Sequence, residues 1–314
     1  MLQNSTICIT GGAGFIGSEL ASVLVEHNKV VVFDNFSRNA LSSKVCANHP
    51  NLTVIKGDIC DFDAVFEACR GADYIIHCAG IAGINTVCRS PTRTLQVNMI
   101  GSWNLLEAAA RHGLVRRVIS FSTSEVFGGM AFGSSEMDRS VIGAAGEARW
   151  TYAVSKLAEE HMSIAYCREK GLPSTVLRPF NIYGPGQVGE GALKIFVEQA
   201  LKNEPITIYG DGTQIRSWCY VSDMVAATLL CMENDGAIGE SFNIGNVRSV
   251  ETIYGLANTV VRICNSSSLI RFVPAKSADI ELRIPCVKKA KEVLGFEARV
   301  DLEEGIRLTA ASLR

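Results

Sequence analysis

The stretch TGGAGFIG, residues 10–17, follows the short apolar run TICIT and opens a run with helical periodicity. Its glycines at 11, 14 and 17 are spaced three residues apart. Glycines in such a turn let the backbone bend tightly and approach a pyrophosphate, whose charge is favoured at the amino end of a helix. The stretch therefore predicts a dinucleotide site between the first strand and the first helix.

An acidic residue at the end of the next apolar run indicates which dinucleotide binds. The run KVVVFD, residues 29–34, ends at Asp34, where a carboxylate can accept hydrogen bonds from ribose hydroxyls. The same charge disfavours the 2′-phosphate of NADP. NAD is therefore the expected cofactor, although Arg38 nearby leaves NADP open.

Short β-branched runs alternate with helical patterns up to residue 179, which predicts an α/β fold with a Rossmann-type, doubly wound parallel sheet. Beyond that point the elements shorten and glycines separate them. We expect an NAD-binding domain at 1–178 with returns to the sheet near 214–248, and a smaller, interleaved substrate-binding part at 179–314. The expected strands are 6–10, 29–34, 52–58, 72–78, 116–122 and 173–179, and the expected helices are 15–27, 61–69, 92–111 and 150–170.

Composition excludes some classes of partner. The net charge is −2, so bulk electrostatics favours neither nucleic acid nor a membrane surface. The eleven cysteines contain no CxxC and predict reduced thiols in a cytoplasmic protein. The five histidines lack metal-ligand spacing, and no apolar run approaches the roughly 20 residues of a membrane helix. We expect neither a metal site nor a membrane partner.

A tyrosine and a lysine lie four residues apart in RWTYAVSK, residues 149–156. On a helix Tyr152 and Lys156 share one face. An ammonium beside a phenol favours the phenolate, so the tyrosine can act as a general base near neutral pH. The strand ending in FSTS places Thr123 at the same edge of the sheet, which predicts a catalytic centre there.

Together these motifs resemble the extended short-chain dehydrogenase/reductases that modify nucleotide sugars, and RPFNIYGPG at 178–186 adds to the likeness. The resemblance implies an NAD-dependent enzyme in which Tyr152 takes a proton from the sugar 4-hydroxyl while hydride leaves C4 for NAD. It also implies a homodimer formed through helices 92–111 and 150–170. The implied cofactor-binding residues are Gly11, Gly14, Phe15, Ile16, Gly17, Asp34, Asn35, Asp58, Ile59, Ala79, Asn98, Tyr152, Lys156 and Pro179.

The reaction that follows C4 oxidation depends on the residues after Thr123. The pair Ser124-Glu125 is similar to that of UDP-glucuronate decarboxylases and some GDP-sugar dehydratases, whereas simple 4-epimerases usually lack the carboxylate. Residues 279–306 are also similar to a bacterial decarboxylase of this group. The resemblance implies catalytic roles for Thr123, Ser124, Glu125, Tyr152 and Lys156, and substrate-binding roles for Arg149, Asn181, Arg216 and Arg283.

Decarboxylation of UDP-glucuronate is the leading interpretation of these residues. Dehydration of a nucleotide hexose, at 4,6 or 5,6, comes second, and 4-epimerisation comes third. A non-catalytic NAD-binding regulator is a remote alternative, because such proteins typically lose the pair that Tyr152 and Lys156 form here.

Overall fold

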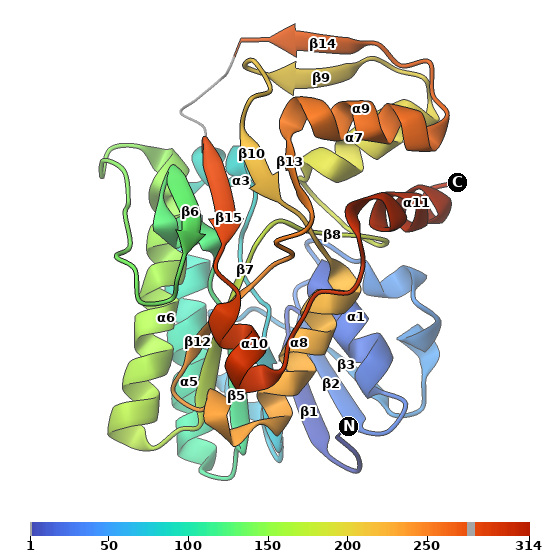
Figure 1. The fold of residues 1–314 in the computed structure, drawn as a ribbon. Coiled ribbons are helices and arrows are strands. Elements are labelled where there is room, and N and C mark those ends of the chain that lie inside the picture. Colours follow the sequence, from blue (N-terminus) through green and yellow to red (C-terminus); the bar gives the residue numbers. More distant parts are fainter. Residues whose placement is uncertain (1, 275–279) are drawn as a thin grey trace.

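The computed structural model describes residues 2–274 and 280–314. Its centre is a seven-stranded parallel sheet in the order β12-β7-β5-β4-β1-β2-β3 (Figure 1). The chain winds outward in both directions from β1, which confirms the predicted Rossmann-type fold. The strands are β1 Thr6–Thr10, β2 Lys29–Asp34, β3 Leu52–Lys56, β4 Tyr74–His77, β5 Arg117–Phe121, β7 Ser174–Pro179 and β12 Ser241–Ile244.

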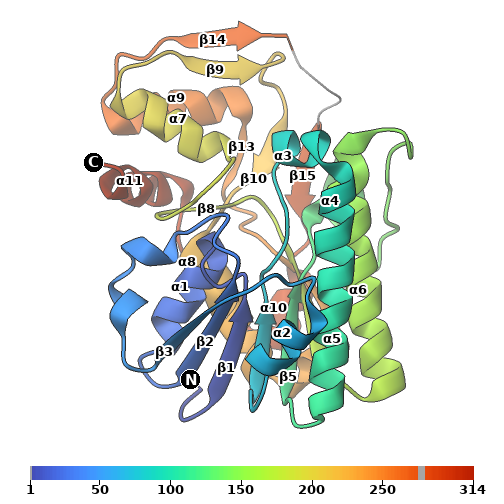
Figure 2. The ribbon, with the colours of Figure 1, turned by 180° about the vertical axis from the view of Figure 1, so that it is seen from behind.

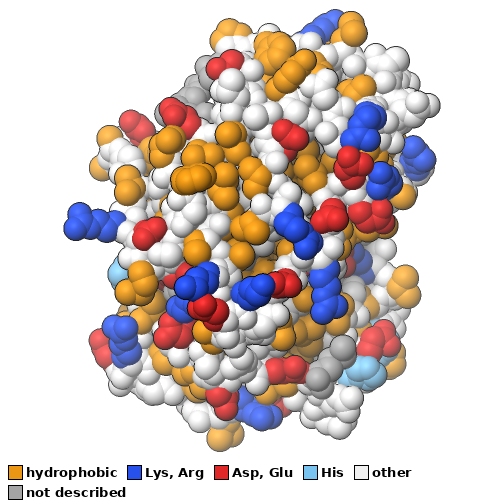
Figure 3. Space-filling model, viewed as in Figure 1, with side chains coloured by type: hydrophobic (Ala, Val, Ile, Leu, Met, Phe, Trp, Pro, Cys, Tyr) orange, Lys and Arg blue, Asp and Glu red, His pale blue; other side chains and the backbone are white. Residues whose placement is uncertain are grey.

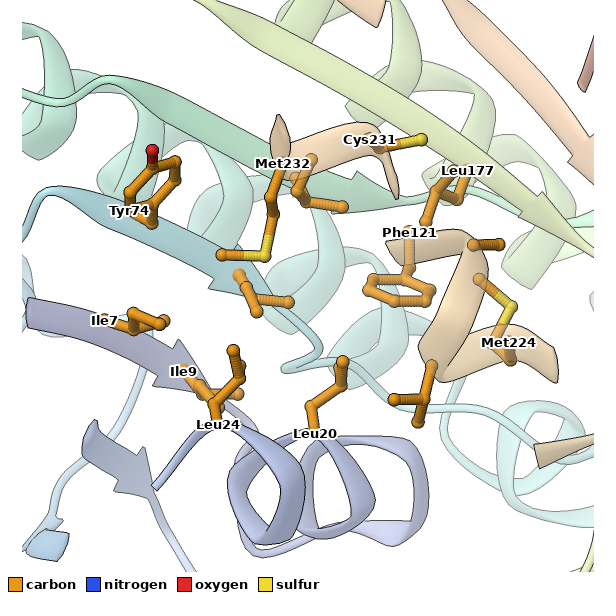
Figure 4. Close-up of a cluster of buried hydrophobic side chains, with 14 of the residues drawn as sticks. Ile7, Ile9, Leu20, Leu24, Tyr74, Phe121, Leu177, Met224, Cys231 and Met232 are labelled. Atoms are coloured by element: carbon orange, nitrogen blue, oxygen red, sulfur yellow. The ribbon is translucent and has the colours of Figure 1, made fainter. Parts of the chain in front are cut away.

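Helices cover both faces of this sheet. Successive side chains of β1 point to opposite faces, and Ile7 and Cys8 are both fully buried, in two separate clusters. Figure 4 shows the first cluster, in which Ile7 and Ile9 lie beside Leu20 and Leu24 of α1. The helices nearest the sheet are α1 Phe15–Leu24, α8 Val221–Glu233 and α10 Lys288–Leu294 on one face, and α2 Phe62–Ala68, α5 Gly101–His112 and α6 Thr151–Lys170 on the other (Figures 1 and 2).

The helix expected at 92–111 is interrupted. The chain forms α4 Pro91–Leu95, a π-helical segment η3 Gln96–Ile100, and then α5. A π-helical turn accommodates one extra residue, and Asn98 within it is fully buried. Such turns occur frequently at functional sites, and the loop that Asn98 contacts lines the cavity described below.

A smaller group of elements lies over the carboxyl edge of the sheet (Figure 1). It contains a sheet in the order β13-β10-β15-β6 and the pairs β11-β8 and β14-β9. Its strands are β6 Met130–Ser134, β8 Ile182–Tyr183, β9 Ile206–Tyr209, β10 Ile215–Ser217, β11 Cys219–Tyr220, β13 Val250–Thr252, β14 Ile270–Val273 and β15 Leu282–Pro285. The remaining helices are α3 Ile84–Arg89, α7 Ala192–Leu201, α9 Ile253–Cys264 and α11 Leu302–Ser312, with short 3₁₀ turns η1 Leu41–Ser43, η2 Val45–Asn48, η4 Ser124–Phe127, η5 Ala148–Trp150 and η6 Asp235–Ala237.

The surface and the thiols agree with the composition. Lysine and arginine side chains lie among aspartate and glutamate across the face shown in Figure 3. All eleven cysteines belong to the described residues and are free thiols. Within residues 2–274 and 280–314, no helix has the length and apolar character needed to cross a membrane.

Candidate active site

A cavity of about 510 Å³ opens at the carboxyl edge of the main sheet, beside the neighbouring strands β1 and β4, from which the chain order runs in opposite directions. Ligands of open α/β sheets bind at such a switch point. The cavity walls include all the predicted cofactor-binding residues except Asp58 and Asn98. Thr123 also lines the cavity, whereas Ser124, Glu125 and the four predicted substrate-binding residues lie outside its walls.

The glycine turn packs directly against the end of β4. Gly11 has a φ of 69°, and a Cβ added there would lie 2.4 Å from the amide nitrogen of Ala79. A Cβ on Gly17 would lie 2.5 Å from the carbonyl oxygen of Gly11, so neither position accepts a side chain without movement of the backbone. The first turn of α1 contains no acidic residue and has no side-chain cap, which suits a bound anion.

Asp34 is fixed by one backbone amide of the glycine turn and by one just after its own strand. Its carboxylate accepts hydrogen bonds from the amides of Ala13, at 2.9 Å, and Phe36, at 2.7 Å. Burial raises the pKa of Asp34, while these amides act in the opposite direction. Each carboxylate oxygen retains a lone pair that can accept a ribose hydroxyl. Arg38 donates to Ala82 O and to Thr86 Oγ1, so its guanidinium has partners within the chain.

Two predicted cofactor-binding residues, Asp58 and Asn98, do not line the cavity. Each contacts a residue that does. Asp58 pairs with Arg93 at 2.8 Å, and Arg93 lines the cavity. The amide of Cys60 and then Arg93 lower the pKa of Asp58. Asn98 is fully buried and accepts from the amide of Ile81 at 2.7 Å, which positions the loop after β4. We therefore place both residues behind the cavity walls.

Tyr152 and Lys156 project from the first turns of α6 into the cavity. Burial is the largest cause that raises the pKa of Tyr152, followed by the charges of Glu125 and Glu159, whereas the Thr123 hydroxyl lowers it. The oxygen of that hydroxyl accepts from the amide of Glu125 at 3.2 Å. The proton of the Thr123 hydroxyl is therefore available to the phenol of Tyr152 or to an oxygen of a bound ligand. Burial thus favours the protonated form of the phenol.

A carboxylate between two arginines lies on the far side of Tyr152. Glu125 accepts from Arg149 at 2.6 Å, and Arg283 lies 3.9 Å from its other oxygen. The side chains of Glu125, Arg149 and Arg283 are only 17%, 7% and 5% exposed. Such buried charges persist because they are paired. These three residues, called the Glu125 cluster below, carry one net positive charge.

The remaining predicted substrate-binding residues lie in the upper part of the molecule. Arg216 on β10 is the parallel-sheet partner of Arg283 on β15, so their side chains share one face. The Arg216 guanidinium donates to the carbonyl oxygens of Ile215 and Ile280. Asn181 donates to the carbonyl oxygen of Ser217 at 2.7 Å. The planar guanidinium of Arg216 is suited to bind two oxygens of a diphosphate.

The sequence did not reveal two acidic residues of the site. Glu190 accepts from the amides and side chains of Asn85 and Thr86 at 3.0 to 3.2 Å, which holds the loop containing Gln187 and Val188 against the cavity. Nothing in the sequence connects Glu190 with α3. Glu159 accepts a hydrogen bond from Lys156 at 2.7 Å. Because the two residues lie three apart on one helix, the sequence could have indicated this contact.

Comparison with known proteins agrees with this geometry. A model of the "NAD dependent epimerase/dehydratase family" matches residues 7–245. The chain is 36% identical to a UDP-N-acetyl-alpha-D-glucosaminuronate decarboxylase of Bacillus cytotoxicus, over 96% of this chain and 95% of that protein. It is 36% identical to UDP-glucuronic acid decarboxylase 5 of Arabidopsis thaliana, over 99% and 90%. A solved UDP-glucuronic acid 4-epimerase of Bacillus cereus, in complex with UDP-glucuronic acid and NAD, superposes with a TM-score of 0.90 at 27% identity, covering 98% of each chain.

Proposed function

Since the chain belongs to the NAD dependent epimerase/dehydratase family, we propose that it decarboxylates a UDP-uronate through a 4-keto sugar. The observation that supports this most strongly is the Glu125 cluster beside Tyr152. Its two arginines suit a sugar that bears a carboxylate at C5.

The glycine turn, the uncapped first turn of α1 and Asp34 fit NAD, and we assign the cofactor to this cavity with its adenosine ribose at Asp34. NAD supplies the hydride acceptor for oxidation at C4. Tyr152 is proposed to accept the proton of the sugar 4-hydroxyl, and the positive charge of Lys156 stabilises the resulting phenolate. Thr123 is proposed to donate a hydrogen bond to the C4 oxygen as its charge changes.

Decarboxylation needs a carboxylate that enters the site but is not held tightly. Arg149 and Arg283 attract the C5 carboxylate, and the charge of Glu125 weakens that attraction. Once C4 is a ketone, the electrons of the bond to the carboxylate delocalise onto the C4 oxygen as carbon dioxide leaves, and C5 then takes up a proton from water. Thr123 lies where it can stabilise that oxygen. Ser124, which is buried beside Glu125, is proposed to help to orient the glutamate.

We assign the nucleotide end of the substrate to the part formed mainly by residues 179–314. Arg216 is proposed to bind the diphosphate and Asn181 to contact the sugar diphosphate, because both lie on elements that meet above the Glu125 cluster. R216M should raise KM for the nucleotide sugar by about 100-fold, since a bidentate phosphate contact would be lost. An unchanged KM would contradict this assignment.

We propose a homodimer formed through α5 and α6. Met99 and Ile100 on η3, Trp103 on α5 and Val154 on α6 expose apolar side chains, and Trp103 is 52% exposed. Burying such a patch is favourable. Light scattering should give twice the chain mass, and a monomer would contradict the proposal.

The free thiols also favour a reducing compartment such as the cytoplasm.

The second candidate is 4-epimerisation of the same uronate, which the structural likeness to a UDP-glucuronic acid 4-epimerase favours. Mass spectrometry of the products separates the candidates. The protein is incubated with NAD and, separately, with UDP-glucuronate, UDP-N-acetylglucosaminuronate, UDP-glucose and dTDP-glucose. Loss of carbon dioxide from a uronate is the expected result. An unchanged mass with a new retention time would indicate epimerisation, and loss of water from a hexose would indicate a dehydratase.

A further inference from the structure

The segment between β8 and α7 forms part of the wall of the cofactor cavity. Its residues Gln187, Val188 and Glu190 line the cavity, as do residues of the glycine turn at 10–17. Figures 1 and 2 show this segment crossing above α1 on its way from β8 to α7. We call residues 184–191 the strap. A cofactor in this cavity therefore lies against the glycine turn on one side and against the strap on another.

The backbone of the strap packs closely on two side chains of the NAD-binding part. A Cβ added to Gly189, which has a φ of 84°, would lie 2.8 Å from Cζ of Arg38. A Cβ added to Gly186 would lie 3.2 Å from Nζ of Lys44, which pairs with Glu19 of α1. Glycine at these two positions thus lets the strap lie directly on the segment that follows β2.

Glu190 fixes the strap to the start of α3. One oxygen of its carboxylate accepts hydrogen bonds from the amide of Asn85 at 3.0 Å and from the side-chain nitrogen of Asn85 at 3.2 Å. The other oxygen accepts from the amide of Thr86 at 3.1 Å and from the Thr86 hydroxyl at 3.0 Å. Both amides belong to the first turn of α3, whose N-cap residue provides no side-chain hydrogen bond. Four hydrogen bonds to one carboxylate therefore hold the strap, and bonds to a charged acceptor are stronger than neutral ones.

Thr86 connects Glu190 with Arg38. The Arg38 guanidinium donates to the Thr86 hydroxyl at 3.5 Å and to the carbonyl oxygen of Ala82 at 2.9 Å. Burial acts to raise the pKa of Glu190, but the hydrogen bonds from α3 and then the charge of Arg38 lower it. The carboxylate is therefore charged at neutral pH. The segments that follow β2, β4 and β8 thus meet at one charged contact beside the cavity.

Movement of a cofactor past this wall requires the strap to open. Glu190 must then give up its four hydrogen bonds to α3, and Gly189 must separate from Arg38. We propose that Glu190 is a positioning residue that holds the strap closed over the bound cofactor and thereby limits the rate of cofactor exchange. The proposal rests on the proposed function only for the identity of the cofactor. Its consequence is that contacts at α3, outside the catalytic centre, determine how long one cofactor molecule stays bound.

The exchange rates of NADH test this without any sugar substrate. Stopped-flow fluorescence measures NADH association with cofactor-free protein, and NADH dissociation in a chase with excess NAD⁺, for the wild type, E190Q and E198Q. The amide nitrogen of E190Q cannot accept hydrogen bonds, so dissociation should be faster by about 10- to 100-fold. E198Q is the matched control and should keep the wild-type rates, because Glu198 on α7 pairs with Lys194 and lies outside the cavity walls.

The association rate separates closure of the strap from a direct contact with the cofactor. If Glu190 also holds the strap closed in the cofactor-free protein, E190Q should speed association and dissociation alike. The dissociation constant should then change by less than about threefold. An unchanged dissociation rate would overturn the proposal. Faster dissociation with an unchanged association rate would also overturn it, because Glu190 would then be an ordinary cofactor contact.

T86V keeps the test decisive if E190Q does not fold. It preserves the shape of the side chain and removes one of the four hydrogen bonds to Glu190, so dissociation should be faster by about three- to tenfold. Dissociation at the wild-type rate in T86V would contradict the proposal. Failure of decarboxylation in the product assay would leave these exchange rates unaffected, so the two proposals can fail separately.

Discussion

The cofactor end of the site and the Glu125 cluster are built in opposite ways. The cofactor end uses the turn at residues 10–17 and Asp34, which lie within one short stretch of chain and act largely through backbone geometry. The Glu125 cluster combines η4, η5 and β15, so that Glu125 and Arg283 meet across 158 residues of sequence (283 − 125). Cofactor binding is therefore a local property of this chain, whereas the choice of reaction depends on tertiary structure.

Tyr152 lies where the two regions meet, and its replacement should have the largest effect. Y152F removes the general base but keeps the ring, so turnover should fall by roughly 10³-fold or more while NAD affinity changes less than about threefold. Steady-state kinetics and NAD titration check the two halves of this prediction. If NAD affinity fell as much as turnover, Tyr152 would be needed for cofactor binding as well as for the reaction.

G17A should damage the cofactor end alone. The added Cβ meets the backbone of Gly11, so NAD affinity should fall by roughly 100-fold, and the unfolding free energy by about 1–3 kcal/mol. G146A is the matched control, because a Cβ there meets nothing within 4 Å. If both variants bind NAD like the wild type, the steric account of the turn is wrong.

R149M should damage the Glu125 cluster alone. It leaves a largely buried Glu125 without its closer partner, which should lower the unfolding free energy by about 1–3 kcal/mol after allowance for the partial exposure of Glu125. Chemical denaturation measures this change, and NAD titration should show an unchanged affinity. R139M provides a control at an exposed arginine for which no ion pair is found among the described residues. Equal losses in R149M and R139M would mean that the buried pair adds nothing to stability.

D34N should give the smallest effect. Loss of the charge at the ribose should weaken NAD binding by about tenfold and narrow the preference for NAD over NADP. The ratio of the two dissociation constants is the measurement. A wider preference for NAD would show that Asp34 does not exclude the 2′-phosphate.

The sequence predicted the local features of the molecule better than the distant ones. Six strands of the main sheet and the cavity residues of the glycine turn follow from hydrophobic runs and turn chemistry that neighbouring residues determine. The π-helical segment at Gln96–Ile100 interrupts an ordinary helical pattern, and nothing in the composition of that stretch signals it. The contacts that bring Arg283 to Glu125 and Glu190 to α3 join distant segments, so no periodicity could reveal them.

The most direct test of the central claim separates oxidation at C4 from the step that follows. In a single turnover of NAD-loaded protein with UDP-glucuronate, absorbance of the reduced nicotinamide and release of carbon dioxide are followed together for the wild type and E125Q. We predict that E125Q still forms reduced nicotinamide but releases carbon dioxide at least about 100-fold more slowly. Release of carbon dioxide at the wild-type rate in E125Q would contradict the claim that the Glu125 cluster determines the reaction.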